Sequence, residues 1–283
     1  MAMTVVAELR ELAERALAED APAGDLTSEL VIPSDAGCTA ELRSKAPGIV
    51  AGVGIAQRVL EVAVEQDGLG AVHSAWNVAD GGAVVAGDLL ATFRGPARSI
   101  LRAERVVVNF LAHLSGIATL TRAFVVAASP AAILCTRKTT PGLRTLEREA
   151  VAAGGGTLHR SSLSDAVLIK DNHLALAGSI RAAIARGRAG GGGIEVEVET
   201  LEQLGEAIEA GAERILLDNP TPELVKDAIE RVGEPERLEI SGGVTLESVR
   251  ALVDAGARVI SVGRVTHSAP AVDLSLEIVD DRT

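Results

Sequence analysis

Polar or glycine-rich residues follow each of a series of short apolar runs in the second half of the chain. The runs AAILCT, AVLIK, IEVEV, RILLD, LEIS and RVISVG mostly alternate with helical patterns such as TLEQLGEAIEAGA. This alternation is typical of βαβ units and a parallel sheet, and a parallel α/β barrel has its active site at the carboxyl ends of its strands. Any one of these residues alone is better interpreted as a solvated loop residue, but the whole series favours a site at one rim. The residues at the predicted strand ends are Arg137, Lys138, Lys170, Glu199, Asp218, Ser241, Gly242, Gly243, Val262, Gly263 and Arg264.

The basic residues of this rim predict a ligand that carries several negative charges. Arg137, Lys138, Arg160 and Lys170 are concentrated in one region of a chain whose formal net charge is −12 at pH 7. Arginine binds planar carboxylates through two parallel hydrogen bonds, whereas lysine acts as a point charge for phosphate. His159 stands directly before Arg160 and is a further candidate ligand of the substrate.

Two other arginines of this region have a simpler interpretation. Arg144 and Arg148 lie at helical spacing in the segment LRTLEREA, where Glu147 and Glu149 can pair with them. Arg148 is therefore interpreted as a structural residue rather than as part of the site.

Carboxylates end two very apolar strands, at Glu199 and Asp218. Such groups need a metal, a ribose diol or a basic partner, and Mg²⁺ is commonly held by carboxylates together with substrate phosphates. By strand periodicity Glu195, Glu197 and Glu199 share one face, which we expect to point into the barrel. Glu199 lies nearest the strand end and is the first choice for a functional role.

The glycine-rich loops ISGGV and SVGR follow the last two predicted strands. Backbone N–H groups in such loops can hold a phosphate, and barrels frequently bind phosphate with the loops after their last two strands. Together the two loops predict a phosphate site.

Composition excludes several classes of function. The negative charge and an aromatic content of 1% disfavour nucleic acid as a partner. Cys38 and Cys135 stand in unrelated contexts without a CxxC pair, which indicates reduced thiols. No Ser-His-Asp or Cys-His arrangement is suggested, so covalent acyl chemistry is disfavoured. We see no signal peptide, and we expect no apolar stretch long enough to span a membrane, so a cytoplasmic protein is expected.

The chain divides into two predicted regions. Residues 4–19 form an amphipathic helical pattern, residues 38–94 contain short strands interrupted by a helix at about 55–64, and a long helical stretch covers about 98–128. The expected domains are an N-terminal α/β domain at 1–113 and a barrel domain at 114–270, with a tail at 271–283 that can return to the first domain.

The motifs closely resemble the quinolinate phosphoribosyltransferase family, also called nicotinate-nucleotide pyrophosphorylase (carboxylating). The matching segments are EDAPAGDLTSEL, ERVVVNFLAHLSGIATLT, CTRKTTPGLR, HRSSLSDAVLIKDNHL, IEVEVET, ILLDN, ISGGV and SVGRVTHS. They follow the family's order over nearly the whole chain. The resemblance implies an α/β fold with an N-terminal α/β sandwich domain and an incomplete parallel α/β barrel, the type II phosphoribosyltransferase fold.

The resemblance also implies an activity and its residues. Quinolinate and phosphoribosyl pyrophosphate, with Mg²⁺, would give nicotinate mononucleotide, pyrophosphate and carbon dioxide in NAD biosynthesis. The implied metal residues are Glu199 and Asp218. A homodimer is implied, because the family supplies the arginine at position 105 from the neighbouring subunit. The implied quinolinate residues are Arg105, Arg137, His159, Arg160 and Lys170, and Thr136 is a further substrate-binding residue. The ribosyl and pyrophosphate residues are Lys138, Lys170, Glu199 and Asp218, and the 5′-phosphate falls on the two glycine loops.

Three alternatives stay open at this point. One is a related phosphoribosyltransferase of the subgroup associated with molybdenum transport. Another is an enzyme of the same fold that acts on nicotinate or nicotinamide, which would need fewer arginines. The third is a non-catalytic sensor of anionic ligands on the same barrel, disfavoured by the joint presence of Lys138, Lys170, Glu199 and Asp218.

Overall fold

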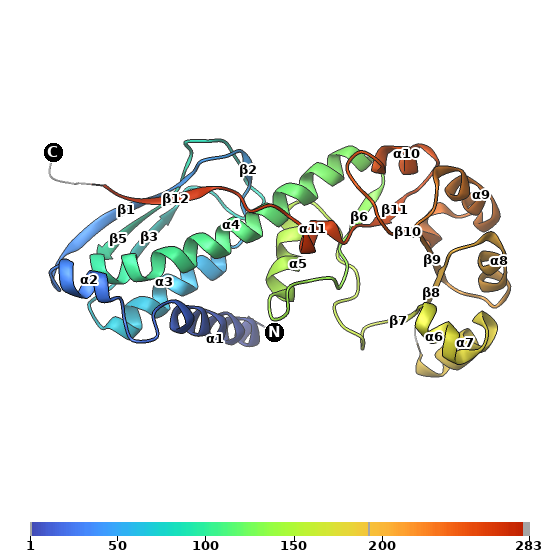
Figure 1. The fold of residues 1–283 in the computed structure, drawn as a ribbon, viewed down its shortest axis with the longest axis horizontal. Helices are drawn as coiled ribbons and strands as arrows, with labels where there is room; N and C mark the ends of the chain where they lie inside the picture. The colour runs from blue at the N-terminus through green and yellow to red at the C-terminus, as the bar shows by residue number, and fades with distance from the viewer. Residues whose placement is uncertain (1, 192, 280–283) are drawn as a thin grey trace. The chain divides into compact units, whose positions relative to one another are not determined.

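The computed structural model describes residues 2–191 and 193–279, and the chain forms two compact units (Figure 1). One unit contains the chain up to Thr119 together with the segment that begins at Pro270, and the other is Leu120–Ala269. The boundary therefore falls inside the long helix, slightly beyond the expected residue 113.

The N-terminal unit is built on a four-stranded antiparallel sheet in the order β12-β1-β5-β3. The last strand of the chain pairs with the first, with Thr39 opposite Val279 and Ser44 opposite Leu274. The C-terminal segment is thus part of this unit. The elements are α1 (Ala2–Asp20), α2 (Leu26–Val31), β1 (Gly37–Ser44), β2 (Gly48–Ile49), α3 (Val53–Asp67), β3 (His73–Trp76), β4 (Ala83–Val84), β5 (Leu89–Pro96) and β12 (Leu274–Val279).

Helix α3 shows how local sequence defines the elements of this unit. Glycines in the left-handed region flank it, with φ of 98° at Gly52 and 64° at Gly68. The N–H of Gly68 donates to the carbonyl of Val64 and ends the helix. A Cβ at Gly52 would lie 2.6 Å from Leu114 Cδ1, so glycine also permits close packing on the next long helix.

That helix, α4 (Ala97–Ala128), contributes residues to both units. Within the described residues it is the one helix long and apolar enough, by length and composition, to cross a membrane, with a mean hydropathy of 1.5 over its most apolar window. The expectation that no stretch reaches this length was therefore wrong. Since Ile100, Val107, Leu111 and Phe124 are buried, core packing accounts for part of this apolar character.

The second unit contains a six-stranded parallel sheet in the order β6-β11-β10-β9-β8-β7. Each predicted apolar run forms one of these strands. The strands are β6 (Ala132–Leu134), β7 (Val167–Ile169), β8 (Ile194–Val198), β9 (Arg214–Asp218), β10 (Leu238–Ser241) and β11 (Val259–Ser261). The helices are α5 (Arg144–Ala153), α6 (Asp171–Ala177), α7 (Ile180–Gly187), α8 (Leu201–Glu209), α9 (Pro222–Val232), α10 (Val249–Asp254) and α11 (Arg264–His267), with short 3₁₀ turns at Arg188–Gly190 and Pro235–Arg237.

The barrel is incomplete, as the sequence predicts. Strands β6 and β7 are the two edges of the sheet, and a single parallel bridge between Leu134 and Thr157 adds the segment after α5 beside β6. The N–H of Thr157 donates to Ile133 and the N–H of Cys135 donates to Thr157. This pairing brings the residues that follow Thr157 to the same rim as the end of β6.

Capping residues place the loops at the carboxyl ends of the strands. The side chain of Thr200 accepts the N–H of Gln203 at the start of α8, and the side chain of Thr221 accepts the N–H of Leu224 at the start of α9. Each helix therefore begins three or four residues after its strand ends. The strand ends themselves stay level, since Asp218 lies opposite Ser241 in the register of β9 and β10.

Candidate active site

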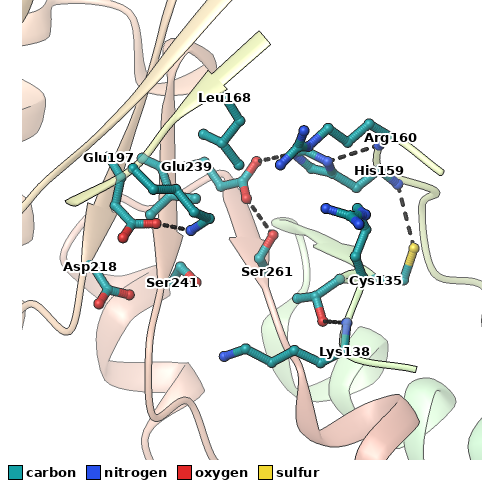
Figure 2. Close-up of a pocket in the computed structure, with 14 residues that line it drawn as sticks. Cys135, Lys138, His159, Arg160, Leu168, Glu197, Asp218, Glu239, Ser241 and Ser261 are labelled. Atoms are coloured by element: carbon teal, nitrogen blue, oxygen red, sulfur yellow. Dashed lines mark hydrogen bonds and ion pairs between the residues drawn. The ribbon is translucent and has the colours of Figure 1, made fainter. Parts of the chain in front are cut away.

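A pocket of about 350 Å³ opens at the carboxyl ends of the barrel strands, entirely within the second unit (Figure 2). Eight of the predicted site residues line it, with additional residues from the strands beneath. The lining residues are Cys135, Thr136, Arg137, Lys138, His159, Arg160, Leu168, Lys170, Glu197, Leu216, Asp218, Glu239, Ser241 and Ser261. Basic and acidic groups from five of the six strands or their flanking segments thus meet in one cavity, together with Ser261 from β11.

The segment after β6 brings three predicted residues to the pocket. The hydroxyl of Thr136 accepts the N–H of Lys138 at 3.1 Å, and the carbonyl of Lys138 accepts the hydroxyl of Thr266 at 2.8 Å. These bonds fix the backbone between Thr136 and Lys138. The Nε atom of Arg137 is buried and has no hydrogen-bond partner within the described part of the chain. A buried guanidinium with an unused donor is suited to an anionic ligand.

Helix α5 holds the second basic segment. Arg148 donates to the carbonyl of His159 at 2.8 Å and to that of Arg160 at 3.3 Å, and the N–H of His159 points to Cys135 Sγ at 3.5 Å. Arg148 therefore has the structural role expected of it, although its partners are backbone carbonyls. Arg144, one turn earlier, donates to the carbonyl of Ser161 at 3.1 Å.

Arg160 lies close enough to other charged groups for them to change its pKa. Burial is the main cause that lowers its pKa, and the neighbouring positive charge of Arg137 adds to the effect. An arginine stays protonated under these conditions, so the lowered pKa indicates two guanidinium groups that lack full compensation. A dianionic ligand between them would supply it.

Lys170 and Glu197 form an ion pair in the wall of the pocket (Figure 2). Lys170 stands at the N-cap position of α6, where its backbone N–H donates to Nδ1 of His173 at 2.9 Å. His173 thus helps to cap the start of α6. The carboxylate that meets Lys170 comes from the middle of β8 rather than from its end.

Glu199, the first choice among the acidic residues, takes a different position. It follows the last residue of β8, its side chain is exposed, and it does not appear among the described residues that line the pocket. Its backbone N–H donates to Oε1 of Gln203 in the first turn of α8. The expectation that all three glutamates of IEVEVET point into the barrel is therefore corrected: Glu195 and Glu197 do, and Glu199 turns toward solvent.

Asp218 reaches the pocket with a constrained neighbour. Asn219 is the one non-glycine residue in the described chain with positive φ, at 51°. Its backbone N–H donates to the carbonyl of Ser241 at 2.8 Å, and its side-chain amide donates to Asp218 Oδ2 at 2.7 Å. Strained backbone of this kind is often found at functional sites, where the surrounding structure holds it in place.

The first glycine loop is shaped by the same asparagine. Gly242 has φ of 90°, and a Cβ at this position would lie 2.3 Å from Asn219 Oδ1 and 2.6 Å from its backbone nitrogen. Gly243, with φ of 58°, is also in the left-handed region. Ser241 lines the pocket directly, whereas the two glycines form its adjoining loop.

The second glycine loop follows β11 and leads into α11. Val262 is buried at 1% exposure and its N–H donates to Leu134, so it acts as a strand residue rather than as a ligand. A Cβ at Gly263 would lie 3.1 Å from Lys138 Cδ, which shows that the Lys138 side chain passes over this glycine. Arg264 is exposed. None of these three appears among the described lining residues of the pocket.

A buried polar cluster lies under the pocket. Nε2 of His159 is 3.3 Å from a carboxylate oxygen of Glu195 and 3.3 Å from one of Glu239. Side-chain hydrogen bonds to these two carboxylates are the main cause that raises the pKa of His159 to about 9. Ser261 donates to the other oxygen of Glu239, and Arg214 contacts that carboxylate at 3.1 Å.

Several functional candidates were missed from the sequence. Glu197 carried a usable signal, because it alternates with Glu195 on one face of an apolar strand. Glu239 and Ser261 carried none, since each is a single polar residue in a short apolar run. Asn219 follows Asp218 in the segment ILLDN, but its positive φ cannot be recognised from residue type alone.

Arg105 lies in α4, on the part that belongs to the N-terminal unit, and its side chain is exposed. It is not among the described residues that line the pocket of the second unit. The geometry of one chain therefore leaves its expected role as a prediction.

Comparisons with known proteins agree with this arrangement. The family described as "Quinolinate phosphoribosyl transferase, N-terminal domain" matches residues 25–115, and its C-terminal domain matches residues 117–277. A probable nicotinate-nucleotide pyrophosphorylase [carboxylating] of Bacillus subtilis is 42% identical, with 96% of this chain and 93% of the relative covered. The chloroplastic enzyme of that name from Arabidopsis thaliana is 40% identical, with coverage of 96% and 83%.

Solved structures give the same result. NadC from Streptococcus pyogenes superposes with a TM-score of 0.87 at 35% identity, over 95% of this chain and 96% of that one. The nicotinate-nucleotide pyrophosphorylase from Francisella tularensis gives a TM-score of 0.87 at 34% identity, with 97% of both chains covered. Sequence, fold and pocket residues agree, and the chain belongs to the quinolinate phosphoribosyltransferase family.

Proposed function

We propose that the pocket of the second unit is the site at which a phosphoribosyl group passes from phosphoribosyl pyrophosphate to quinolinate, with decarboxylation to nicotinate mononucleotide. The family assignment makes the chain a phosphoribosyltransferase of NAD biosynthesis, and the named relatives favour this reaction over the alternative activities. The observation that carries the assignment to this pocket is the meeting of Arg137, Arg160, Lys170 and Asp218 in one cavity.

The arginines account for the acceptor substrate. Quinolinate is a planar dianion, and planar carboxylates are the ligands that guanidinium groups bind best. Arg137 has a buried unused donor, and the pKa of Arg160 is lowered by burial and by Arg137. Two carboxylates placed between these groups would neutralise both charges. Nicotinate, with a single carboxylate, would leave one guanidinium uncompensated.

The other side of the pocket fits the phosphorylated sugar. Lys138 and Lys170 provide point charges, and the loop of Ser241, Gly242 and Gly243 offers backbone N–H groups of the kind that bind phosphate. Asp218 lies level with Ser241 at the end of the neighbouring strand. We assign the ribosyl and pyrophosphate groups to this side.

Magnesium fits this half of the pocket through one residue. Asp218 lines the pocket and can offer a carboxylate oxygen, while the phosphates of the substrate can supply further ligands. Glu197 is engaged by Lys170, and Glu199 is exposed outside the pocket, so the expected pair of Glu199 with Asp218 has no geometric support in one chain. When bound, the ion would neutralise charge on the leaving pyrophosphate.

The proposed reaction does not need a strong general base from the protein. The pyridine nitrogen of quinolinate forms a bond to the anomeric carbon as the bond from that carbon to pyrophosphate breaks. Positive charge on the sugar at that stage resembles the charge at a glycosidic centre and is stabilised by a nearby carboxylate, for which Asp218 is suitably placed. The cationic ring nitrogen then stabilises the electron pair left when the adjacent carboxylate departs as carbon dioxide, and that carbon takes a proton.

We also propose a cytoplasmic homodimer in which Arg105 reaches the active site of the partner subunit. One support is the exposed position of Arg105 on α4. The other is the apolar surface of this helix, since 44% of its most apolar window is buried within the chain. A surface of this kind commonly faces another subunit.

One assay tests the proposed reaction. Loss of quinolinate is followed with phosphoribosyl pyrophosphate and magnesium, and again with each of them left out, while pyrophosphate and carbon dioxide are measured. We expect equal amounts of both products only in the complete mixture. Binding of quinolinate without any product would instead favour a ligand sensor, and equal turnover of nicotinate would assign a different acceptor.

A further inference from the structure

The imidazole ring of His159 is held by the protein at both nitrogens. Nε2 faces the carboxylates of Glu195 and Glu239, each at 3.3 Å, and Nδ1 accepts the backbone N–H of Arg160 at 2.8 Å. A ring engaged in this way has no nitrogen left over for a substrate carboxylate. His159 lines the pocket, so its contribution to binding must come from its position.

Both carboxylates are deeply buried, and Glu239 also lines the pocket. Glu195 is 6% exposed on β8 and Glu239 is 1% exposed on β10. Buried carboxylates are costly unless they are paired, and the partners here are few. Arg214 contacts Glu239 at 3.1 Å and lies 3.6 Å from Glu195, and Ser261 donates to Glu239.

The two carboxylates of this cluster need a donor from the histidine. They share the single guanidinium of Arg214, and a proton on Nε2 of His159 gives both of them a further donor. The charged and titratable groups that face His159 are Glu195, Glu239 and Arg214 from the strands, Arg160 beside it, Arg148 from α5 and Cys135 after β6. The N–H of Arg160 opposes a second proton on Nδ1, whereas every carboxylate contact favours a proton on Nε2.

We propose that Glu195 and Glu239 are positioning residues of the active site: they hold a proton on Nε2 of His159, fix its ring, and thereby fix the backbone that carries Arg160. The inference rests on the proposed function of the pocket. His159 is linked to the next residue by the Nδ1 bond, and Arg148 holds the carbonyls of both. The position of the Arg160 guanidinium therefore depends on the contacts of its neighbour His159 with Glu195 and Glu239.

A metal ion is the competing interpretation of the same cluster. Ligand atoms of His159, Glu195 and Glu239 all lie within 4.8 Å of one another. A cation there would have to displace the proton on Nε2 and lie close to the positive charge of Arg214, which disfavours it. Retention of one equivalent of Zn²⁺ by the wild-type protein after dialysis, but not by the Glu195→Gln/Glu239→Gln double variant, would overturn the proposal.

The state of the ring is tested without reference to turnover. Protein labelled with ¹⁵N-histidine is studied by NMR, with His159→Gln used to assign the signal. We expect Nε2 of His159 to carry a slowly exchanging proton at neutral pH, and the double variant to lose this protection. An unprotonated Nε2 in the wild-type protein would overturn the proposal even if the enzyme is fully active.

The effect on the substrate is tested with single variants. We expect Glu239→Gln to raise the KM for quinolinate by about tenfold, the effect of losing roughly one charge-assisted hydrogen bond, while the KM for phosphoribosyl pyrophosphate changes less than about twofold. Glu209→Gln, which removes an exposed carboxylate paired with Arg181, is the matched control and should change neither value. Equal loss of affinity for both substrates would show a merely structural role.

Two further comparisons distinguish a folding defect of a variant from a failure of the proposed function. Should Glu239→Gln fail to fold, Glu195→Gln, whose carboxylate accepts fewer contacts, provides the same kinetic comparison. Should the wild-type protein leave quinolinate unchanged, the proposed function fails, and the NMR measurement still decides the state of His159.

Discussion

The ammonium group of Lys170 contacts the carboxylate of Glu197, 27 positions further along the chain. Strand register explains the contact. Ile169, the last residue of β7, lies opposite Val196 of the neighbouring β8, so the next residue of each strand projects toward the same rim. The pair therefore follows from backbone pairing alone, and it places one cation and one anion side by side in the wall of the pocket.

This pair separates the roles of two neighbouring glutamates. We expect Glu197→Gln to lower kcat/KM by at least about tenfold, because Lys170 loses the charge that holds it, whereas Glu199→Gln should change kcat/KM by less than about twofold. Steady-state kinetics on both purified variants provide the measurement. A larger loss in Glu199→Gln than in Glu197→Gln would return the functional role to the end of the strand.

The sequence predicted the strands and their ends, but not how deeply each residue at these ends is buried. The apolar runs correctly predicted all six strands, since β-rich runs separated by helical patterns leave few alternatives. Period two correctly gave Glu195 and Glu197 a common face. The end of β8 was not predictable, because the last paired residue is Val198 and the chain then turns as Thr200 caps α8. That turn carries Glu199 out of the barrel.

Long-range partners were the other part that the sequence could not provide. Glu239 belongs to the short apolar run LEIS, and its partner His159 is 80 positions earlier by residue number. No local spacing in the sequence predicts this contact, because it forms only when the folded sheet brings β10 close to the segment after α5. Asn219 is similar, because its close packing on Gly242 joins residues that are 23 positions apart.

The two pocket arginines should bind quinolinate directly. We expect Arg137→Ala or Arg160→Ala to weaken quinolinate binding by about 2–5 kcal/mol, the range for truncating one partner of a desolvated charge pair. Isothermal titration with quinolinate alone measures this. Arg181→Ala, which removes an exposed guanidinium from α7, is the matched control and should bind normally. Unchanged affinity in both pocket variants would remove them from the substrate site.

Subunit mixing tests the proposed role of Arg105. Arg105→Ala and Lys138→Ala are each expected to be inactive, because one lacks a group donated to the partner and the other lacks a group of its own pocket. If the site is shared, a mixed dimer contains one intact site and one doubly damaged site, so activity returns in part. Mixing that restores nothing, with subunit exchange verified by mass spectrometry, would show that Arg105 does not act across an interface.

A matched pair of glycine substitutions tests the phosphate loop. Gly233 and Gly242 both have positive φ, of 76° and 90°, but a Cβ at Gly233 meets nothing within 4 Å whereas one at Gly242 meets Asn219. We expect Gly233→Ala to cost only backbone strain of about 1 kcal/mol in unfolding free energy. Gly242→Ala should cost more and should also raise the KM for phosphoribosyl pyrophosphate, as steady-state kinetics and denaturant unfolding can measure. Equal behaviour of the two variants would contradict the close packing of Gly242 on Asn219.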